Sequence, residues 1–406
     1  GSQGTFAVDS KWLLWNDSDR DGDVISITAV GAGASLTGGN VIIDTDNSSF
    51  DYTGTSTTFS DTATVDVVTT KNTTISGNGL DNIIVGDDDN ERIQGFEGND
   101  VLVGNNGNDT LNGGEGNDLL IGGNGTDSLT GDNGNDVLQG GAGTDSLDGG
   151  NGFDIADFSN ETTGITVTLD ASGNATASGG SLDRLFGIEG LIGGTGNDNF
   201  TGNASANYLD GGSGNDNLAG SDGNDTLIGG AGADTLNGGT GDDVIFGDSL
   251  DSVDGGTNVS NNLLTDGNHG DVLIFDSSID LTAAGLNGHF KGIETISIQN
   301  ATSGASGNQT LSLNINDLVD MSTTGVAAPG GAGYSSQKAL RIDADAGDTI
   351  NLNNSGGGDH WVAATGATGV PAGYTMFVHV ASGITPTVGE DGYVLVSGDG
   401  SNVHTS

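Results

Sequence analysis

The chain lacks cysteine and is poor in proline, aromatic and basic residues. Its 406 residues include no Cys, 3 Pro, 20 Phe, Trp and Tyr together (12 + 3 + 5), and 8 Lys+Arg against 56 Asp+Glu. Without Cys no disulfide can stabilise the fold, which is compatible with a protein that is exported unfolded. The formal net charge of −48 argues against nucleic acid or an anionic membrane surface as a direct partner, and it requires counter-cations.

Long apolar runs are also absent. No stretch approaches the ~18 apolar residues of a membrane-spanning helix, so no membrane insertion is predicted. The N-terminus has neither an initiator Met nor an apolar stretch of the signal-peptide type. Residues 1–4, which begin Gly1-Ser2, are therefore interpreted as an expression scar or linker, and the chain as a fragment of a longer protein.

Glycine and aspartate are abundant and follow a regular nine-residue pattern. A chain that is only 33% hydrophobic and strongly charged would ordinarily be disordered. Here the text Gly-Gly-x-Gly-x-Asp-x-Leu-x, seen at residues 113–121, recurs in fixed phase through two stretches. A disordered tract would not hold acidic and aliphatic residues in phase, so an ordered repeat is predicted.

This nonapeptide predicts a parallel β-solenoid that binds Ca²⁺. If two units form one coil, turns 18 residues apart stack on the same side, which pairs Asp100 with Asp118 and Asp118 with Asp136. Stacked strands lie ~4.8 Å apart, and carboxylates at that distance repel by about 3 kcal/mol at an effective dielectric near 20. Each coil has about two large aliphatic residues to bury, worth roughly 1.5–3 kcal/mol apiece. The metal is therefore expected to be a condition of folding.

Calcium suits such a turn better than magnesium, because Ca²⁺ takes six to eight oxygen ligands in flexible geometry whereas Mg²⁺ demands a strict octahedron. The rival interpretation, a glycine-rich phosphate cradle, lacks the Gly-Lys-Ser/Thr text. The predicted metal ligands are the carboxylates of Asp81, Asp100, Asp109, Asp118, Asp127, Asp136, Asp145, Asp154, Asp198, Asp216, Asp225, Asp234 and Asp243, with the carbonyls of turn residues such as Gly104, Gly113, Glu115, Gly122, Asn124, Gly211, Ser213, Gly229 and Ala231.

Some units depart from the pattern. Glu91 and Asn207 stand where an aspartate is expected, and the glycine pairs are lost near residues 86–95 and 202–207. Those units are expected to bind metal weakly or not at all.

A second candidate calcium loop lies near the N-terminus. Acidic side chains alternate there as in the first half of an EF-hand loop, but the twelfth position is Thr28 rather than the bidentate Glu that an EF-hand requires. The alternative is a solvated acidic turn. The candidate ligands are Asp17, Asp19, Asp21 and Asp23.

The repeat, and the alternating strand-like sequences on either side of it, divide the chain into segments. The predicted fold is all-β, with two calcium-bound β-rolls flanked by β-domains. The expected segments are an immunoglobulin- or cadherin-like β-sandwich at 5–72, a first roll at 73–158, a bridging β segment at 159–191, a second roll at 192–256 and a mostly-β domain with a secretion signal at 257–406.

Both repeat blocks resemble the repeats-in-toxin (RTX) β-roll family. The LLWNDSDRDGD text of residues 13–23 is similar to modules of bacterial surface proteins, and the texts of residues 316–322 and 343–352 resemble the ends of large bacterial adhesins. The resemblance implies Ca²⁺ held between stacked turns, export by type I secretion machinery, and a location outside the cell or on the bacterial surface.

No enzymatic function is expected. The sequence has no His-Glu-x-x-His or Gly-x-Ser-x-Gly motif, and its five histidines show no metal-ligand spacing. The leading hypothesis is a calcium-dependent structural and secretion module of a cell-surface adhesin, whose partners include surface or host glycans or proteins. The alternatives are the non-catalytic tail of a secreted hydrolase or epimerase, and a surface-layer or ice-binding protein.

Overall fold

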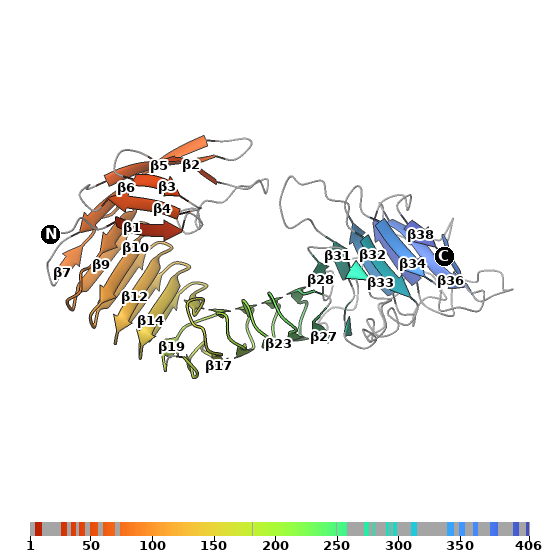
Figure 1. The fold of residues 1–406 in the computed structure, drawn as a ribbon. Coiled ribbons are helices and arrows are strands. Elements are labelled where there is room, and N and C mark those ends of the chain that lie inside the picture. Colours follow the sequence, from red (N-terminus) through yellow and green to blue (C-terminus); the bar gives the residue numbers. More distant parts are fainter. Residues whose placement is uncertain are drawn as a thin grey trace. The chain divides into compact units, whose positions relative to one another are not determined.

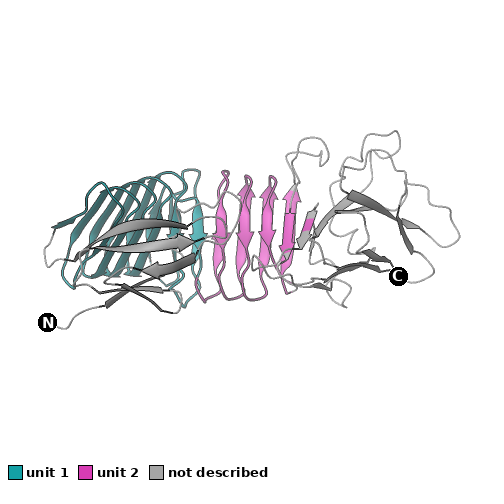
Figure 2. Ribbon diagram, turned by 90° about the horizontal axis from the view of Figure 1, so that it is seen from above, with its two compact units in different colours: residues 1–193 teal, residues 194–406 magenta. Residues whose placement is uncertain are grey.

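The computed structural model describes residues 74–180, 182–248 and 250–257 and, outside these, residue 293 and short strands near both ends of the chain. Every secondary-structure element described is a β-strand, which confirms the all-β prediction for these parts (Figure 1). No helix with the length and apolarity to cross a membrane occurs among them. Two compact units are formed, residues 1–193 and 194–406 (Figure 2).

Unit 1 contains two parallel sheets built from alternate repeats. The chain visits the sheets in turn, and neighbouring strands of one sheet are 18 residues apart, as in Leu102↔Leu120 and Leu111↔Leu129. The predicted coil of two nonapeptides is therefore confirmed. One sheet contains β8 (Asn82–Val85), β10 (Val101–Asn106), β12 (Leu119–Gly125), β14 (Val137–Gly143), β16 (Ile155–Asp157) and β20 (Gly190–Ile192); the other contains β7 (Thr74–Ser76), β9 (Arg92–Glu97), β11 (Thr110–Glu115), β13 (Ser128–Asn133), β15 (Ser146–Asn151) and β19 (Arg184–Phe186).

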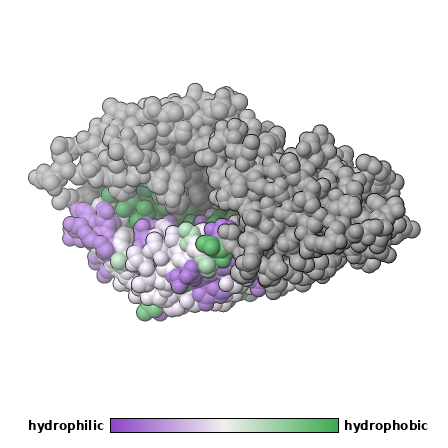
Figure 3. Space-filling model, turned by 45° about the vertical axis from the view of Figure 1, so that its right-hand side comes forward, coloured by the Kyte–Doolittle hydropathy of each residue, from purple (hydrophilic) through white to green (hydrophobic). Residues whose placement is uncertain are grey.

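The aliphatic residue at the eighth position of each repeat forms the core. Leu120 and Leu129, from the two sheets of unit 1, are both 0% exposed. The residues on either side of Leu129 in the strand are more exposed, as period-two alternation requires. Leu119, which precedes Leu120, is also buried. Over the face seen in Figure 3, the described residues are mainly polar or intermediate in hydropathy, with few apolar patches.

Residues 159–191 form an insertion and then resume the coil. Strand β17 (Thr166–Thr168) and strand β18 (Ala175–Thr176) belong to the insertion, and β18 pairs antiparallel with β19. Strand β19 pairs in parallel with β15, and β20 with β16. The strands expected in the bridging segment are therefore present, and two of them extend the sheets of the repeat. Antiparallel β18 also covers an edge of β19.

Unit 2 repeats this arrangement, and its parallel pairing continues past the last nonapeptide. The register again has an 18-residue step, as in Leu209↔Leu227 and Leu218↔Leu236. One sheet contains β21 (Asn199–Thr201), β23 (Asn217–Asp222), β25 (Thr235–Thr240), β27 (Ser252–Thr257) and β30 (Phe290–Lys291); the other contains β22 (Tyr208–Asp210), β24 (Thr226–Ile228), β26 (Val244–Phe246), β28 (Val272–Phe275), β31 (Thr295–Ile298) and β33 (Ala339–Ala344).

The remaining C-terminal strands complete unit 2. Strand β37 pairs in parallel with β33, and β35, β36 and β37 form an antiparallel ribbon. A further parallel sheet has the order β29-β32-β34-β38. The bounds are β29 (Ile279–Asp280), β32 (Thr310–Asn314), β34 (Thr349–Asn353), β35 (His360–Ala363), β36 (Tyr374–Val380), β37 (Tyr393–Ser397) and β38 (Val403–Thr405).

The N-terminal strands pair antiparallel, as a β-sandwich would require. The pairs are β1 with β4, β3 with β4, β2 with β5, and β5 with β6, while β6 also pairs in parallel with β8. Their immunoglobulin- or cadherin-like topology stays a prediction. The predicted acidic loop at Asp17, Asp19, Asp21 and Asp23 lies outside the described residues. The bounds are β1 (Thr5–Asp9), β2 (Ser26–Val30), β3 (Ala34–Thr37), β4 (Asn40–Asp44), β5 (Ser49–Thr55) and β6 (Ser60–Thr69).

Candidate metal centre

The three glycines of a repeat have two different roles. Those at the second and fourth positions have positive φ, as in Gly114 (φ 119°) and Gly116 (φ 127°), a conformation that glycine adopts without steric cost. The glycine at the first position does not have positive φ. At Gly122, a Cβ would lie 2.5 Å from Oδ2 of Asp127 and 2.6 Å from the carbonyl oxygen of Gly140. The first glycine is therefore needed for space, whereas the second and fourth are needed for their positive φ.

The repeat aspartates are buried, and one oxygen of each binds the neighbouring coil. For example, the backbone N–H of Asp100 donates to Oδ1 of Asp118, 18 residues later, at 2.7 Å. The same bond, at 2.7–2.9 Å, is accepted by Oδ1 of Asp100, Asp109, Asp118, Asp127, Asp136, Asp145, Asp154, Asp216, Asp225, Asp234 and Asp243.

The second carboxylate oxygen has the opposite environment. Within the described region Oδ2 is buried and has no hydrogen-bond partner in Asp100, Asp109, Asp118, Asp127, Asp136, Asp145, Asp154, Asp216, Asp225 and Asp234. Leaving a buried charged acceptor unsatisfied costs at least ~1–3 kcal/mol. A regular column of such oxygens fits a cation that supplies the missing interaction.

Backbone carbonyl oxygens also lie near Oδ2 of the repeat aspartates. Beside the first glycine of most turns, Oδ2 of that turn's aspartate and the carbonyl oxygen of the first glycine one coil later border the same space, as in the Gly122 example. Among the predicted carbonyl ligands, those of Gly104, Gly113, Gly122 and Gly229 border these spaces. Uncharged oxygens next to a carboxylate are the donor set that Ca²⁺ prefers.

The predicted carbonyls at the third position have a different environment. Glu115, Asn124 and Ala231 already accept backbone N–H groups at 2.8–3.0 Å, which leaves each of their carbonyl oxygens one further lone pair. Ser213 is bridged to Ala231 of the next coil, and Gly211 begins the turn that contains Ser213.

Burial makes the carboxylates reluctant to ionise. Burial is the main reason that the pKa of Asp136 is raised to about 8 and that of Asp118 to about 7, and neighbouring carboxylates contribute to the same rise. Backbone N–H groups act in the opposite direction but do not compensate. Without a cation at these turns, the ionised columns would therefore oppose the fold.

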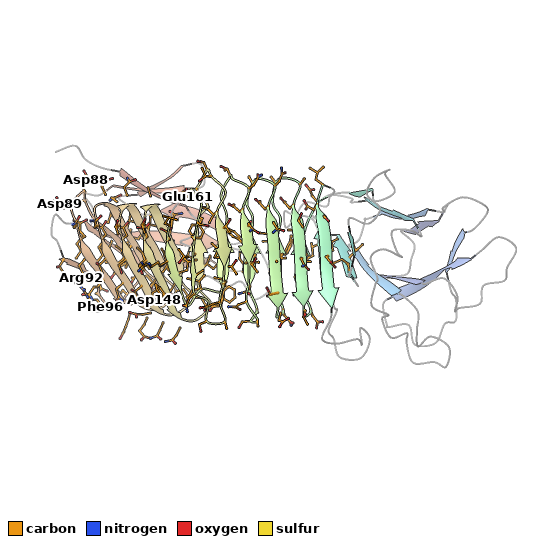
Figure 4. All side chains as sticks on the ribbon, turned by 90° about the horizontal axis from the view of Figure 1, so that it is seen from below. Asp88, Asp89, Arg92, Phe96, Asp148 and Glu161 are labelled. Carbon is orange, nitrogen blue, oxygen red and sulfur yellow. The ribbon has the colours of Figure 1, made fainter. Side chains whose placement is uncertain are left out.

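The two faces of unit 1 carry separate sets of turns. In Figure 4 the turn with Asp88 and Asp89 and the strand end with Phe96 lie at opposite margins of unit 1. Because consecutive turns alternate in this way, Asp100, Asp118 and Asp136 form one column, while Asp109, Asp127 and Asp145 form the other.

In the first repeats of unit 1, the residue in the aspartate position differs from the prediction. The slot expected for Asp81 is occupied by Asn82, whose N–H donates to Oδ1 of Asp100. Asp81 lies one residue earlier, where its Oδ1 accepts the N–H of Asn99. Later Asn99 and Asn117 accept an N–H from the next coil in the same way. Counting back in steps of nine from Asp100 gives Glu91 and then Asn82, so Asp81 lies one residue out of phase with the column. A ligand role for Asp81 stays a prediction.

Glu91 and Asn207 do occupy slots of the column, as expected. Glu91 is buried and its N–H donates to Oδ1 of Asp109 at 2.7 Å. Oδ1 of Asn207 accepts the N–H of Asn203 at 2.7 Å, and Asn207 has no charge to attract a cation. Asp198 begins the series of unit 2, and its Oδ2 accepts the N–H of Gly194 at 3.0 Å.

Three acidic residues that are out of phase with the nine-residue period were missed. Asp145 donates its N–H to Oδ1 of Asp183, Asp154 to Oε2 of Glu189, and Asp234 to Oδ1 of Asp251, at 2.8, 3.0 and 2.9 Å. The acceptor follows at 38, 35 and 17 residues instead of 18, so a fixed period could not find it. A local signal exists, because an aliphatic residue stands two positions after Asp183, Glu189 and Asp251, as in the repeats.

Side chains alone do not make the site. Among the residues that the structure describes, no three acidic, His or Cys side chains converge as a metal cluster. An ion at these turns would therefore need backbone carbonyls beside the carboxylates.

Comparison with known proteins identifies the repeat. The family model for the RTX calcium-binding nonapeptide repeat matches residues 76–111, 85–120, 94–129, 121–156, 187–218 and 219–253. No curated protein matches the chain. The matched residues include the buried aspartates and the glycine turns described above, and such repeats are a structural calcium-binding module. The repeat region of this chain, residues 76–156 and 187–253, therefore belongs to the RTX family of calcium-binding nonapeptide repeats, and the ion it binds is Ca²⁺.

Proposed function

We propose that the chain is a calcium-dependent folding and secretion module of an exported bacterial cell-surface adhesin. The observation that carries the proposal is the column of buried carboxylate oxygens that have no hydrogen-bond partner within the described part of the chain. Such a column is unfavourable where Ca²⁺ is scarce and is stabilised where Ca²⁺ is abundant. The module would therefore stay unfolded in the cell and fold outside it.

The proposed ligands are the sixth-position aspartates together with turn carbonyls. Each ion would lie between turns of adjacent coils, so aspartates 18 residues apart, such as Asp118 and Asp136, would share it. The hydrogen bond from the Asp118 N–H to Oδ1 of Asp136, with 2.8 Å between nitrogen and oxygen, supports this because it keeps the two residues of adjacent coils side by side.

Folding by calcium is tested with far-UV circular dichroism of the whole chain. With excess EDTA at neutral pH the β signal is expected to disappear, and excess Ca²⁺ is expected to restore it. Equimolar Mg²⁺ should not substitute, since Mg²⁺ keeps its water and requires octahedral geometry. An unchanged β signal in EDTA would contradict the proposal.

Secretion is tested separately. The sequence of residues 343–352 supports the presence of a type I secretion signal within residues 257–406, as does the RTX family to which the repeats belong. In cells that carry a type I exporter, the full chain should accumulate in the medium, and a chain without residues 257–406 should stay in the cell. Equal export of both would contradict this part. Surface glycans or proteins are the proposed targets of the adhesin as a whole.

A further inference from the structure

The first roll carries aliphatic residues on the outside of one of its two sheets. In the sheet of β8, β10, β12, β14 and β16, the residue before each core aliphatic points away from the core, because successive side chains of a strand alternate. These outward residues are in register from coil to coil, yet their exposed fractions are only 1–6%. They are Ile83, Val101, Leu119, Val137 and Ile155.

The nonapeptide itself does not account for this row. In the other sheet of unit 1, Thr110 and Ser128 stand at the same position of the repeat and are exposed. In unit 2, Thr226 and Val244 stand there and are partly exposed. The seventh position of Gly-Gly-x-Gly-x-Asp-x-Leu-x is open to any residue, so the buried aliphatic row is a separate property of the first roll.

An outward face with so little exposure requires a second layer of the chain over it. The insertion at 159–191 is an unsuitable source, because its strand β18 pairs with β19 in the other sheet. The N-terminal strands enter on the correct side. Strand β6 pairs in parallel with β8, which places Val67 beside Ile83 on the outward face. In the next pairing Val65 stands opposite Phe50, so the apolar face continues from the roll into β6 and β5.

The separate three-stranded sheet β1-β4-β3 has a complementary surface. Its register places Phe6 opposite Ile43 and Val8 opposite Val41, and Val41 opposite Leu36. Paired residues, and residues two apart in a strand, share a face of a sheet. All five therefore lie on one face, while the sequence of the other face is mainly polar. Two sheets that each have one apolar face are stable when those faces pack together.

We propose that the outer aliphatic face of β10, β12 and β14 is the docking surface of the sheet β1-β4-β3 of the same chain. The N-terminal strands and the first roll then form one two-layered body. A second copy of the chain is the rival occupant. The continuous pairing of β6 with β8 favours the intramolecular one, because it keeps the two surfaces at a high effective concentration. It follows, on the proposed function, that the N-terminal sheet docks only after Ca²⁺ has folded the roll.

Amide hydrogen exchange of the full chain in Ca²⁺ tests the docking surface. The double variant Leu119→Thr and Val137→Thr gives the first roll the residue that unit 2 has at Thr226, and threonine suits a strand. Because a hydroxyl buried without a partner is costly, exchange of the β1 and β4 amides should become about tenfold faster. The N–H groups of Asp109 and Asp127, which report the roll itself, should stay protected.

The matched control is Val244→Thr, the same change at the same repeat position, where the side chain is already partly exposed. It should leave exchange in β1 and β4 unchanged. Unchanged exchange there in the double variant would overturn the inference. Loss of protection in the wild-type chain on dilution would also overturn it, because a second copy would then be the occupant.

A change on the N-terminal sheet tests the same contact without altering the roll. In Val8→Asp, hydroxyl-radical labelling of Leu119 and Val137 should rise several-fold while the Asp109 N–H stays protected. Unchanged labelling would contradict the docking surface. Equal protection of Asp109 in Ca²⁺ and in chelator would instead contradict the proposed function and not the docking surface, so the two failures are distinguishable.

Discussion

At the scale of the single residue, the two oxygens of the repeat aspartates from Asp100 to Asp154 have different surroundings. Oδ1 accepts a backbone N–H from the adjacent coil, whereas Oδ2 is buried without a hydrogen-bond partner among the described residues, as in Asp136. One side chain thus links two coils and presents an oxygen to a cation. Asparagine could do the first but lacks the charge for the second.

Replacing Asp136 by Asn separates these two contributions. The N–H of Asp118 would still find an oxygen acceptor, but a charged ligand is lost. The calcium midpoint of folding should rise, and the calcium-saturated chain should lose about 1–3 kcal/mol of stability, measured by urea unfolding in Ca²⁺.

The control for that change is Asp132→Asn, an exposed residue four positions earlier whose Oδ2 accepts the Asn112 amide at 2.5 Å. It keeps its hydrogen bond and is expected to change stability by less than ~0.5 kcal/mol. Equal effects of the two variants would contradict a special role for the buried column.

A methyl group at Gly122 should be poorly tolerated. A Cβ there would lie 2.5 Å from Oδ2 of Asp127 and 2.6 Å from the Gly140 carbonyl, so the turn must shift. Gly122→Ala should cost about 1–3 kcal/mol in Ca²⁺ and weaken calcium binding. Gly79→Ala, whose nearest contact is the flexible end of Glu97 at 3.3 Å, should be nearly neutral in the same urea and calcium titrations.

The residues in phase with the repeat were predictable, whereas those out of phase were not. A nine-residue period places Asp100 and Asp118 correctly, because each coil repeats the same backbone path. Asp183 and Asp251 escape it because the preceding loops have different lengths, although the slot they occupy is the same. The position of the acidic acceptor is set by its hydrogen bond to the neighbouring coil. A fixed sequence period finds that position only where the connecting loops have equal lengths.

At the scale of the element, no strand of the repeat could stand alone. Strands of three to seven residues contribute few buried side chains, and β13 has Leu129 as its one buried aliphatic residue. Such strands depend on the coils above and below them, as expected for a solenoid.

Truncating one core leucine should therefore weaken the calcium-loaded fold. Leu129 is 0% exposed, and Leu129→Ala is expected to cost about 2–5 kcal/mol. Leu80, 61% exposed, serves as control, and Leu80→Ala should stay within ~0.5 kcal/mol. Thermal or urea unfolding in saturating Ca²⁺ measures both, and a small effect at Leu129 would mean that metal alone maintains the coil.

The pairing of elements was predictable only where the repeat is regular. The 18-residue step follows from two nonapeptides per coil. The continued parallel ladder from β26 through β28 and β31 does not follow from it, because the connecting segments differ in length and composition. Aliphatic strands can extend the sheet without the nonapeptide, and an aliphatic strand sequence does not indicate whether the strand pairs in parallel.

At the scale of the whole molecule, charge links folding to both calcium and pH. Burial raises the pKa of Asp136 to about 8 and those of Asp118 and Asp225 to about 7. A raised pKa means that the folded state binds protons more tightly than the unfolded state, whose Asp pKa is about 3.9. The resulting stability is fully present below about pH 4 and is lost as pH rises through about 7–8.

The metal-free chain should accordingly be more stable at pH 4 than at pH 8. With saturating Ca²⁺ the trend should reverse, because protons compete with the ion for the carboxylates. Urea midpoints across this range, with and without Ca²⁺, measure both trends. Greater stability of the metal-free chain at pH 8 would contradict the assignment of buried, protonatable carboxylates.

Amide hydrogen exchange at the repeat aspartates tests the central claim, that calcium is a condition of the fold, most directly. The N–H groups of Asp100, Asp118 and Asp127 donate to Oδ1 of the aspartates one coil later, so their protection reports the column itself. At neutral pH they should be protected in Ca²⁺ and should exchange at the rate of an unfolded peptide in chelator. Equal protection in both conditions would show that the coils stack without metal and would contradict the account.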